Sequence, residues 1–180
     1  MTRATIATEK GEIQVELFPE DAPKATANFV KLAGEGFFDG VVFHRIVPGF
    51  VIQGGDGQYG KKSSLDGSRV GTGGPGYRFD DEPFTGDYGR GAVAMANAGR
   101  NTNGSQFFIC LEDLAGRLPK QYTIFGQVTD GMDVVDEIAA GRTGPGDRPL
   151  EPVAMTSVTI HPDGPGDGQG YDGQGYDGQG

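Results

Sequence analysis

Polar and apolar residues alternate along several short segments of this 180-residue chain. Glu12–Phe18 reads Glu-Ile-Gln-Val-Glu-Leu-Phe, the period-two pattern of a strand with one buried face. A two-residue turn at Lys10-Gly11 would join it to the preceding strand. The other predicted strands are separated by glycine-rich turns and cover Thr5–Thr8, Val42–Ile46, Phe50–Gln53, Ala92–Ala96, Gln106–Leu111, Thr123–Val128 and Ala154–Ile160.

Two segments show helical spacing instead. The first begins after Asp21, the expected N-cap, with Pro23 in its first turn and glycines at its end. Its apolar residues are Ala22, Ala25, Phe29, Leu32 and Ala33. The second runs from Met132 to Gly141, and Asp130 is its expected cap. Many short strands with two helices predict a closed antiparallel barrel, because closure removes exposed strand edges. The helices would then cover its open ends.

The composition changes after Pro162. The sequence Gly-Asp-Gly-Gln-Gly is followed there by two copies of Tyr-Asp-Gly-Gln-Gly, which contain almost no apolar side chains. Such a sequence cannot bury enough surface to offset the entropy cost of ordering glycine. We therefore predict one domain over residues 1–162 and a disordered tail over residues 163–180. Calcium binding by the tail is a weaker alternative, since a five-residue period does not match the nonapeptide calcium repeats.

The chain is acidic, with a formal net charge of −10 and a sequence pI near 4.5. This balance argues against a nucleic-acid partner, which requires clustered Lys and Arg. Two explanations remain open: a well-solvated surface, or adaptation to a high-salt cytoplasm. No apolar run approaches the length of a membrane span, and the N-terminus lacks the apolar segment of a secretory signal. We therefore expect a cytoplasmic protein without a membrane partner.

Few residues in this chain suit covalent or metal chemistry. The single cysteine, Cys110, lies in an apolar run, where a buried and inert thiol is expected. There are only two histidines, His44 and His161, and no cluster of residues with metal-ligand spacing. The glycine-rich segment Gly71–Gly76 lacks the Lys-Ser/Thr and helix of a phosphate-binding loop. We expect neither a metal nor any other cofactor.

Two long motifs carry most of the information about function. They are Phe43–Asp56 and Met95–Ile109, and each mixes strongly polar with bulky apolar side chains. Together with Gly71–Glu82 and Phe125–Val128, they closely resemble the cyclophilin family of peptidyl-prolyl cis–trans isomerases. The resemblance covers Ala4–Ile160 in the expected order. It implies an eight-stranded antiparallel barrel capped by two helices, which agrees with the fold predicted from the pattern.

Isomerisation of a prolyl bond requires rotation about the amide but no bond to be formed or broken. Amide resonance opposes rotation by about 18–20 kcal/mol. An acceleration of about five decades needs only about 7 kcal/mol of differential stabilisation. A site must grip the proline ring, hold the preceding carbonyl and stabilise an amide whose nitrogen has become pyramidal and basic. No covalent intermediate, base or cofactor is required.

The resemblance assigns roles to particular residues. Arg45 matches the family's catalytic arginine, which acts on the twisted amide. Gln53 would position the guanidinium and bind a substrate carbonyl. The residues expected to bind substrate are Phe50, Val51, Phe108 and Leu118 around the proline, Gly71, Ala96, Asn97, Ala98 and Gln106 along the peptide, and Tyr122. By contrast, Phe107 is expected in the barrel core and His44 in a structural role.

Three departures from the family pattern affect the expected site. Val51 replaces a methionine that many members carry in the pocket, and Tyr122 stands where a histidine is common. The chain contains no Trp, and the family's tryptophan is a major contact for cyclosporin. We therefore expect weak binding of cyclosporin. The connection over residues 57–70 looks long, and its Lys61, Lys62 and Arg69 form either a solvated tip or a basic rim favouring acidic peptides.

Two functions follow from these residues. The first is an active prolyl isomerase that assists folding, with proline-containing peptides and unfolded or folding proteins as partners. The second is a proline-peptide binding module or holdase on the same scaffold, with little or no catalysis. The intact Arg45, Gln53 and Phe108 favour the first, and the substitutions Val51 and Tyr122 leave the second open. A monomer is the expectation implied by the resemblance.

Overall fold

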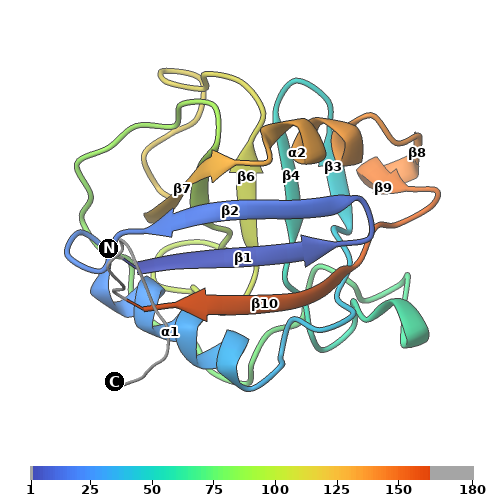
Figure 1. The fold of residues 1–180 in the computed structure, drawn as a ribbon, viewed down its shortest axis with the longest axis horizontal. Coiled ribbons are helices and arrows are strands. Elements are labelled where there is room, and N and C mark those ends of the chain that lie inside the picture. The colour runs from blue at the N-terminus through green and yellow to red at the C-terminus, as the bar shows by residue number, and fades with distance from the viewer. Residues whose placement is uncertain (1, 163–180) are drawn as a thin grey trace.

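A computed structural model describes residues 2–162, and its main feature is a curled sheet of eight antiparallel strands (Figure 1). The strand order is β10-β1-β2-β7-β5-β6-β4-β3. The tail predicted over residues 163–180 lies outside the described part of the chain. The strands of this sheet are β1 (Thr2–Thr8), β2 (Gly11–Leu17), β3 (Arg45–Val47), β4 (Val51–Gly54), β5 (Ala92–Met95), β6 (Phe107–Cys110), β7 (Ile124–Asp130) and β10 (Met155–His161).

The remaining elements are short or helical. The two helices are α1 (Pro23–Gly34), which lies beside β10, and α2 (Met132–Ala139), on the opposite side of the strands (Figure 1). A small second sheet pairs β8 (Thr143–Gly144) with β9 (Arg148–Pro149). Neither helix within residues 2–162 combines the length and the apolar character that crossing a membrane requires.

The eight-stranded antiparallel fold is confirmed, but its closure is less complete than predicted. The outermost strands β3 and β10 do not form a ladder with each other. The segment before β3 makes the connection to the start of β10 and the residues before it: the N–H of Phe43 donates to the carbonyl of Val153 at 3.0 Å, and the N–H of Met155 donates to the carbonyl of Val41 at 2.9 Å. The barrel is thus closed by a few backbone bonds and not by a continuous pair of strands.

Apolar side chains gather on both faces of this sheet. The barrel core contains Phe107, whose ring meets Phe29 of α1 at 5.6 Å and Phe125 of β7 at 6.5 Å, both edge to face. A second group packs on the opposite face of β4, β5 and β6, and we call it the outer cluster. Its members are Val51, Tyr88, Ala92, Ala94, Phe108, Cys110, Leu114 and Ile124, with Phe18, Phe50, Phe84, Ala96, Leu118 and Tyr122 packed against them.

Both predicted helix caps are wrong. The N-cap of α1 is Ala22 and not Asp21, and it makes no side-chain hydrogen bond. Instead, the carboxylate of Glu82, distant in sequence, accepts hydrogen bonds from the N–H groups of Lys24 and Ala25, each at 2.9 Å. A buried acid from another segment thus satisfies the donors that a local cap would satisfy.

The second helix and the first hairpin differ from prediction for backbone reasons. Gly131, with a φ of 92°, is the N-cap of α2, and Asp130 is the last residue of β7. A left-handed conformation at this junction suits glycine, so the chain enters the helix without an Asp cap. In the first hairpin, Thr8 pairs with Gly11, so the turn lies at Glu9-Lys10, one residue earlier than predicted.

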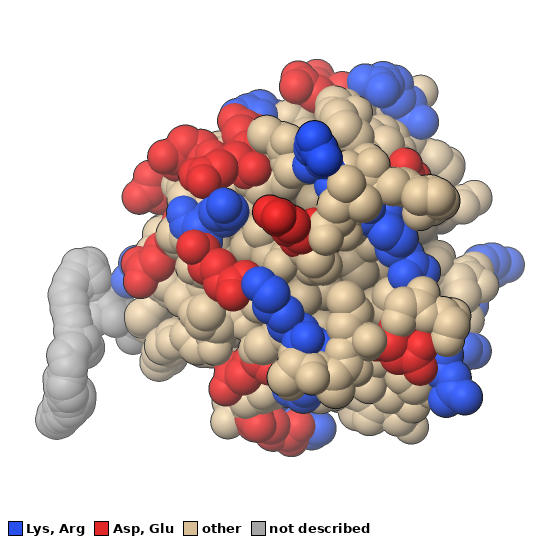
Figure 2. Space-filling model, turned by 90° about the vertical axis from the view of Figure 1, so that its right-hand side faces the viewer, with Lys and Arg blue, Asp and Glu red and all other residues tan. Residues whose placement is uncertain are grey.

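The basic side chains of the 57–70 connection are occupied by contacts. The ammonium of Lys62 lies 2.8 Å from the carboxylate of Glu9, and Lys61 donates to the carbonyl of Asp39 at 2.9 Å. Arg69 lies 3.7 Å from Asp66 within the connection itself. Figure 2 shows acidic and basic side chains interspersed on one face, with the acidic ones gathered toward one side. These contacts favour a solvated loop over a basic rim.

Candidate active site

Arg45, Gln53 and Phe108 lie in one row across the sheet. Arg45 of β3 pairs with Gln53 of β4, and Gln53 pairs with Phe108 of β6. The row continues to Ala94 of β5. Residues directly opposite each other on antiparallel strands point to the same face, so all four side chains project away from the barrel core. The sheet therefore places a cationic side chain, an amide and an aromatic ring side by side.

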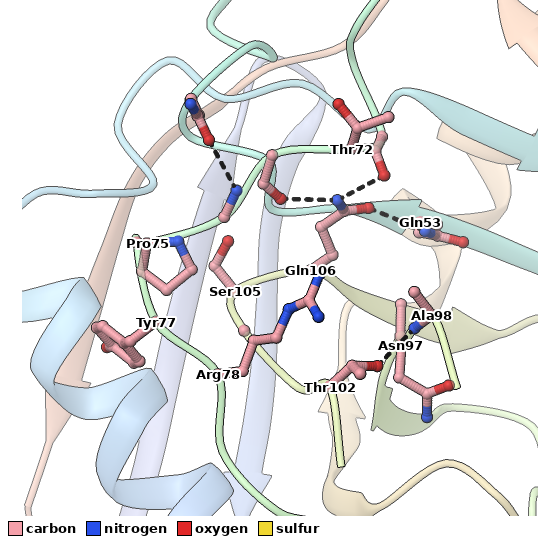
Figure 3. Close-up of a pocket in the computed structure, with 17 residues that line it drawn as sticks. Gln53, Thr72, Pro75, Tyr77, Arg78, Asn97, Ala98, Thr102, Ser105 and Gln106 are labelled. Carbon is pink, nitrogen blue, oxygen red and sulfur yellow. Dashed lines mark hydrogen bonds between the residues drawn. The ribbon is translucent and has the colours of Figure 1, made fainter. Parts of the chain in front are cut away.

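A chain of amide hydrogen bonds fixes the polar part of this row. Arg45 Nη1 donates to Gln53 Oε1 at 3.4 Å, and Gln53 Nε2 donates to Gln106 Oε1 at 3.1 Å. Gln106 Nε2 then donates to the carbonyls of Gly71 and Gly73 at 2.9 and 3.0 Å (Figure 3). The three polar side chains predicted from the motifs thus form one connected network that ends on the glycine-rich segment.

The guanidinium of Arg45 also faces a carboxylate. Its Nε lies 3.9 Å from Asp147 Oδ2, and the two side chains are 41% and 50% exposed. Asp147 belongs to the turn between β8 and β9 and has a φ of 60°. At this distance and exposure an ion pair contributes at most about 1 kcal/mol, so it leaves Arg45 free to meet a ligand.

The apolar residues predicted around a proline ring come together in the outer cluster. Val51 and Phe108 are two of its buried members, and Phe50, Leu118 and Tyr122 pack against the cluster. The Tyr122 ring stands edge to face against Phe108, with ring centroids 5.5 Å apart. Phe107, the next residue along β6, lies in the barrel core as predicted. The cluster is therefore an apolar surface directly beside the polar row.

A cavity of about 690 Å³ lies next to the cluster (Figure 3). Six predicted residues line it: Gln53, Gly71, Ala96, Asn97, Ala98 and Gln106. Arg45 and the apolar residues around the proline position do not line it. Ala96 belongs to both the cavity wall and the edge of the outer cluster, so the two surfaces are continuous. An extended peptide has room to cross from one to the other.

The backbone around Asn97 is partly committed to internal hydrogen bonds. The N–H of Ala96 donates to the carbonyl of Gln106 at 3.0 Å, and the N–H of Ala98 donates to Thr102 Oγ1 at 2.8 Å. The Asn97 side chain donates to the carbonyl of Gln121 at 2.8 Å. Asn97 is the member of this trio whose N–H has no partner within residues 2–162, so it is the donor available to a peptide.

Asp56 organises the glycine-rich wall of the cavity from beneath. Its carboxylate is fully buried and accepts four backbone N–H groups at 2.8–3.0 Å. These donors are Gln58, Tyr59, Gly71 and Gly73. Gly71 has a φ of 101°, a conformation that favours glycine. A Cβ there would also lie 3.4 Å from His44 Nε2, so this wall is built for a residue without a side chain.

Two other titratable groups, one in the first motif and one just after the second, are buried near the site. Burial lowers the pKa of His44 to about 4, so its imidazole is neutral at pH 7. Burial raises the pKa of the Cys110 thiol to about 12, and this residue is buried as predicted. Neither group is thus a proton carrier or a nucleophile at neutral pH.

Sequence reasoning missed part of the cavity wall. Arg78 extends into the cavity from the segment that follows the glycines (Figure 3). The segment Gly71–Glu82 contributed to the resemblance, but only Gly71 received a role from it. The other unpredicted residues are Gln58, Thr72, Gly73, Gly74, Pro75, Gly76, Tyr77, Thr102, Gly104 and Ser105. The run of glycines over Gly71–Gly76, with Pro75 among them, could have predicted that this loop forms a wall of the binding site.

Comparison with known proteins agrees with this geometry. Residues 3–160 match the family model described as cyclophilin type peptidyl-prolyl cis-trans isomerase/CLD. A peptidyl-prolyl cis-trans isomerase of Helicobacter pylori is 48% identical over 77% of this chain and 80% of its own length. Peptidyl-prolyl cis-trans isomerase B of Streptomyces anulatus is 45% identical over 87% of this chain and 95% of its own.

Solved structures support the same assignment. A cyclophilin type peptidyl-prolyl cis-trans isomerase of Cryptosporidium parvum superposes with a TM-score of 0.79 at 33% identity, over 90% of this chain and 98% of its own. Another crystal structure of that protein was determined in the presence of the dipeptide Ala-Pro. The chain therefore belongs to the family of cyclophilin-type peptidyl-prolyl cis-trans isomerases, the class of enzyme that its motifs predicted.

Proposed function

We propose that this protein accelerates rotation about Xaa–Pro peptide bonds by non-covalent electrostatic stabilisation of the twisted imide. Loss of resonance makes the prolyl nitrogen pyramidal and basic, so a charged donor interacts with it more strongly in the transition state than in the ground state. Arg45 supplies that donor. Gln53 holds the guanidinium in position and binds a substrate carbonyl. No proton is transferred, and no covalent bond is formed or broken.

The proline ring binds on the outer cluster in this proposal. Phe50, Val51, Phe108, Leu118 and Tyr122 provide an apolar surface for the ring. Ala96, Asn97 and Ala98 bind the adjoining peptide backbone, and Gly71 and Gln106 contact it further along the cavity. Burying the proline ring holds the nitrogen side of the imide in place. The rotation is then confined to the preceding residue and its carbonyl.

One observation carries the proposal: Arg45, Gln53 and Phe108 share a single cross-strand row on one face of the sheet. Such a row puts a fixed positive charge beside an apolar surface. A holdase would need the apolar surface but not the cation and its amide support. The geometry therefore favours catalysis over the binding module.

The deciding experiment is NMR exchange spectroscopy on an Ala-Pro peptide with catalytic amounts of the protein. The wild type should enhance cis–trans exchange, and Arg45→Ala should reduce the enhancement by about 100-fold or more, the usual cost of removing one transition-state donor. Arg3→Ala, an exposed arginine on β1, is the matched control and should retain full activity. Peptide binding by the wild type without enhanced exchange would support the binding module instead.

The biological setting is a further part of the proposal. The substrates would be proline-containing segments of unfolded or folding proteins. The folding rate of such proteins is limited by slow prolyl isomerisation. A monomeric state and a cytoplasmic location remain predictions from the sequence.

A further inference from the structure

The segment from Phe84 to Tyr88 packs along the segment from Leu114 to Tyr122. The carbonyl of Tyr88 accepts a hydrogen bond from the N–H of Leu114 at 2.7 Å. Lys120 Nζ donates to the carbonyl of Gly86 at 3.1 Å and lies 5.8 Å from the centre of the Phe84 ring. These contacts hold the second segment at its beginning and near its end.

The hydroxyl of Tyr88 makes two further contacts between the two segments, beside the ion pair of Lys120 with Asp87 at 3.8 Å. It donates to the carbonyl of Tyr122 at 2.7 Å and accepts from the N–H of Tyr122 at 3.1 Å. Tyr88 is completely buried, and burial raises the pKa of its hydroxyl to about 12. The hydroxyl therefore keeps its proton at neutral pH and remains able to donate while it accepts.

The segment held in this way carries two of the apolar residues assigned to the proline site. Leu118 is anchored within it, because its N–H donates to the carbonyl of Leu114 at 3.0 Å. Tyr122 stands at its end, with its ring against Phe108. The positions of Leu118 and Tyr122 over the outer cluster therefore depend on how firmly Tyr88 holds Leu114 and Tyr122.

We propose that Tyr88 is a positioning residue for the proline site: through its hydroxyl it fixes Tyr122, and with it the rim of the outer cluster. This inference rests on the proposed function, since it assigns the proline ring to that cluster. Tyr88 touches no substrate and no reacting atom. Its aromatic ring fills space beside Phe84, with ring centroids 5.9 Å apart, but phenylalanine would fill the same space. The hydroxyl is the part of the side chain that positions the rim.

The test is Tyr88→Phe, which removes the hydroxyl and keeps the ring. The dissociation constant for an Ala-Pro peptide, measured by NMR titration, should rise about fivefold, as expected for the loss of a hydrogen-bond pair that orders a binding loop. The turnover of bound peptide should change by less than about twofold, because Arg45 and Gln53 are untouched. If Tyr88 had only a structural role, Tyr88→Phe would lower the melting temperature but would not raise the dissociation constant while leaving the turnover unchanged.

Amide hydrogen exchange provides an internal control in the same variant. The Tyr122 amide loses its acceptor and should exchange about tenfold faster. The Leu114 amide, which donates to the retained backbone carbonyl of Tyr88, should keep its exchange rate. Thr156→Val removes an exposed hydroxyl of β10, which donates to the carbonyl of Ala7, and should change neither the dissociation constant nor these exchange rates.

An unchanged dissociation constant in Tyr88→Phe would overturn the inference, whatever happens to the exchange rates. Failure of the proposed function is recognised separately, because the wild type would then bind peptide without enhancing its isomerisation. If Tyr88→Phe does not fold, hydrogen exchange in the wild type provides the test: the Tyr122 amide should be as strongly protected as the Leu114 amide, because both donate to Tyr88. An unprotected Tyr122 amide would equally overturn the inference.

Discussion

Arg45 and Gln53 face each other directly across the β3–β4 hairpin, with Nη1 of the arginine 3.4 Å from Oε1 of the glutamine. The Pro48-Gly49 turn between them sets this pairing: Gly49 has a φ of 73°, and the chain returns with Val47 opposite Val51. Because Gln53 also reaches Gln106, the guanidinium is held by a network and not by a single neighbour. Arg45 thus has a defined position despite being half-exposed.

Gln53→Ala should therefore reduce kcat/KM by about tenfold, since a misplaced catalytic group loses much of its effect without being removed. The loss should be clearly smaller than that of Arg45→Ala. Gln53→Glu is the informative companion, because it keeps an acceptor for Arg45 but loses the donor to Gln106. Kinetics with an Ala-Pro peptide would check the order of these variants. Equal losses in Gln53→Ala and Arg45→Ala would contradict the supporting role of Gln53.

Asp147 acts on Arg45 from the other side. Its carboxylate partly offsets the positive charge, but an exposed pair at 3.9 Å interacts weakly. We expect Asp147→Asn to raise kcat/KM by no more than about threefold at low salt, with the difference disappearing in molar KCl as screening removes the interaction. Initial rates at low and high KCl would measure this effect. A tenfold loss of activity would instead mean that the carboxylate is needed to orient the guanidinium.

The sequence predicted the strands well because their alternating residues reflect burial on one face of a sheet. The polar and apolar residues that it predicts for the site lie close together in the structure, since the motifs around Arg45 and Asn97 are long enough to be matched residue by residue, and their roles stay predictions. Contacts between distant segments could not be predicted in this way. The cap that Glu82 provides for α1, the four donors on Asp56 and the contact of Tyr88 with Tyr122 all depend on how loops pack after folding.

Weak binding of cyclosporin remains a prediction. The segment that carries Leu118 and Tyr122 offers no indole, because the chain has no Trp. Loss of an aromatic anchor at an interface costs about 2–4 kcal/mol, or roughly 30- to 1000-fold in affinity. Inhibition in a peptide isomerisation assay should therefore require about 30 to 1000 times more cyclosporin than for a family member that carries this tryptophan. Nanomolar inhibition would show that another residue replaces the missing contact.

The stability of the protein should fall between pH 7 and pH 5 because of His44. Burial holds its folded-state pKa near 4, against an ordinary value of 6.5, despite the nearby Asp56 carboxylate, while Arg148 and Arg45 add to the lowering. Between these values the unfolded chain binds a proton that the folded protein does not, so the free energy of unfolding decreases as the pH falls. The expected loss between pH 7 and pH 5 is about 2 kcal/mol.

Urea unfolding at the two pH values would measure this loss, and the two histidines allow a matched comparison. His44→Gln should flatten the pH dependence, whereas His161→Gln should retain it. Glu9 and Asp136, whose pKa values are lowered by Lys62 and Arg90, titrate below this pH window and do not contribute. The same slope in both variants would mean that His44 is not its origin.

Glu82 should be more important for stability than Asp21, although Asp21 lies next to the N-cap Ala22 in the sequence. Glu82 is buried and accepts two backbone N–H groups at the start of α1. Its replacement by Ala leaves these donors unsatisfied, and we expect the free energy of unfolding to fall by about 2 kcal/mol. Asp21 is exposed and makes one long contact, at 3.4 Å from Thr85 Oγ1, so Asp21→Ala should cost less than about 0.5 kcal/mol.

Urea denaturation of both alanine variants at pH 7 would check this order. Glu82→Gln adds a third point, because an amide oxygen can accept one of the two hydrogen bonds without the charge. Its stability should therefore lie between those of the wild type and Glu82→Ala. If Asp21→Ala were the more destabilised variant, the helix would be capped locally in solution, and the contact between α1 and the Glu82 segment would not be what holds its first turn.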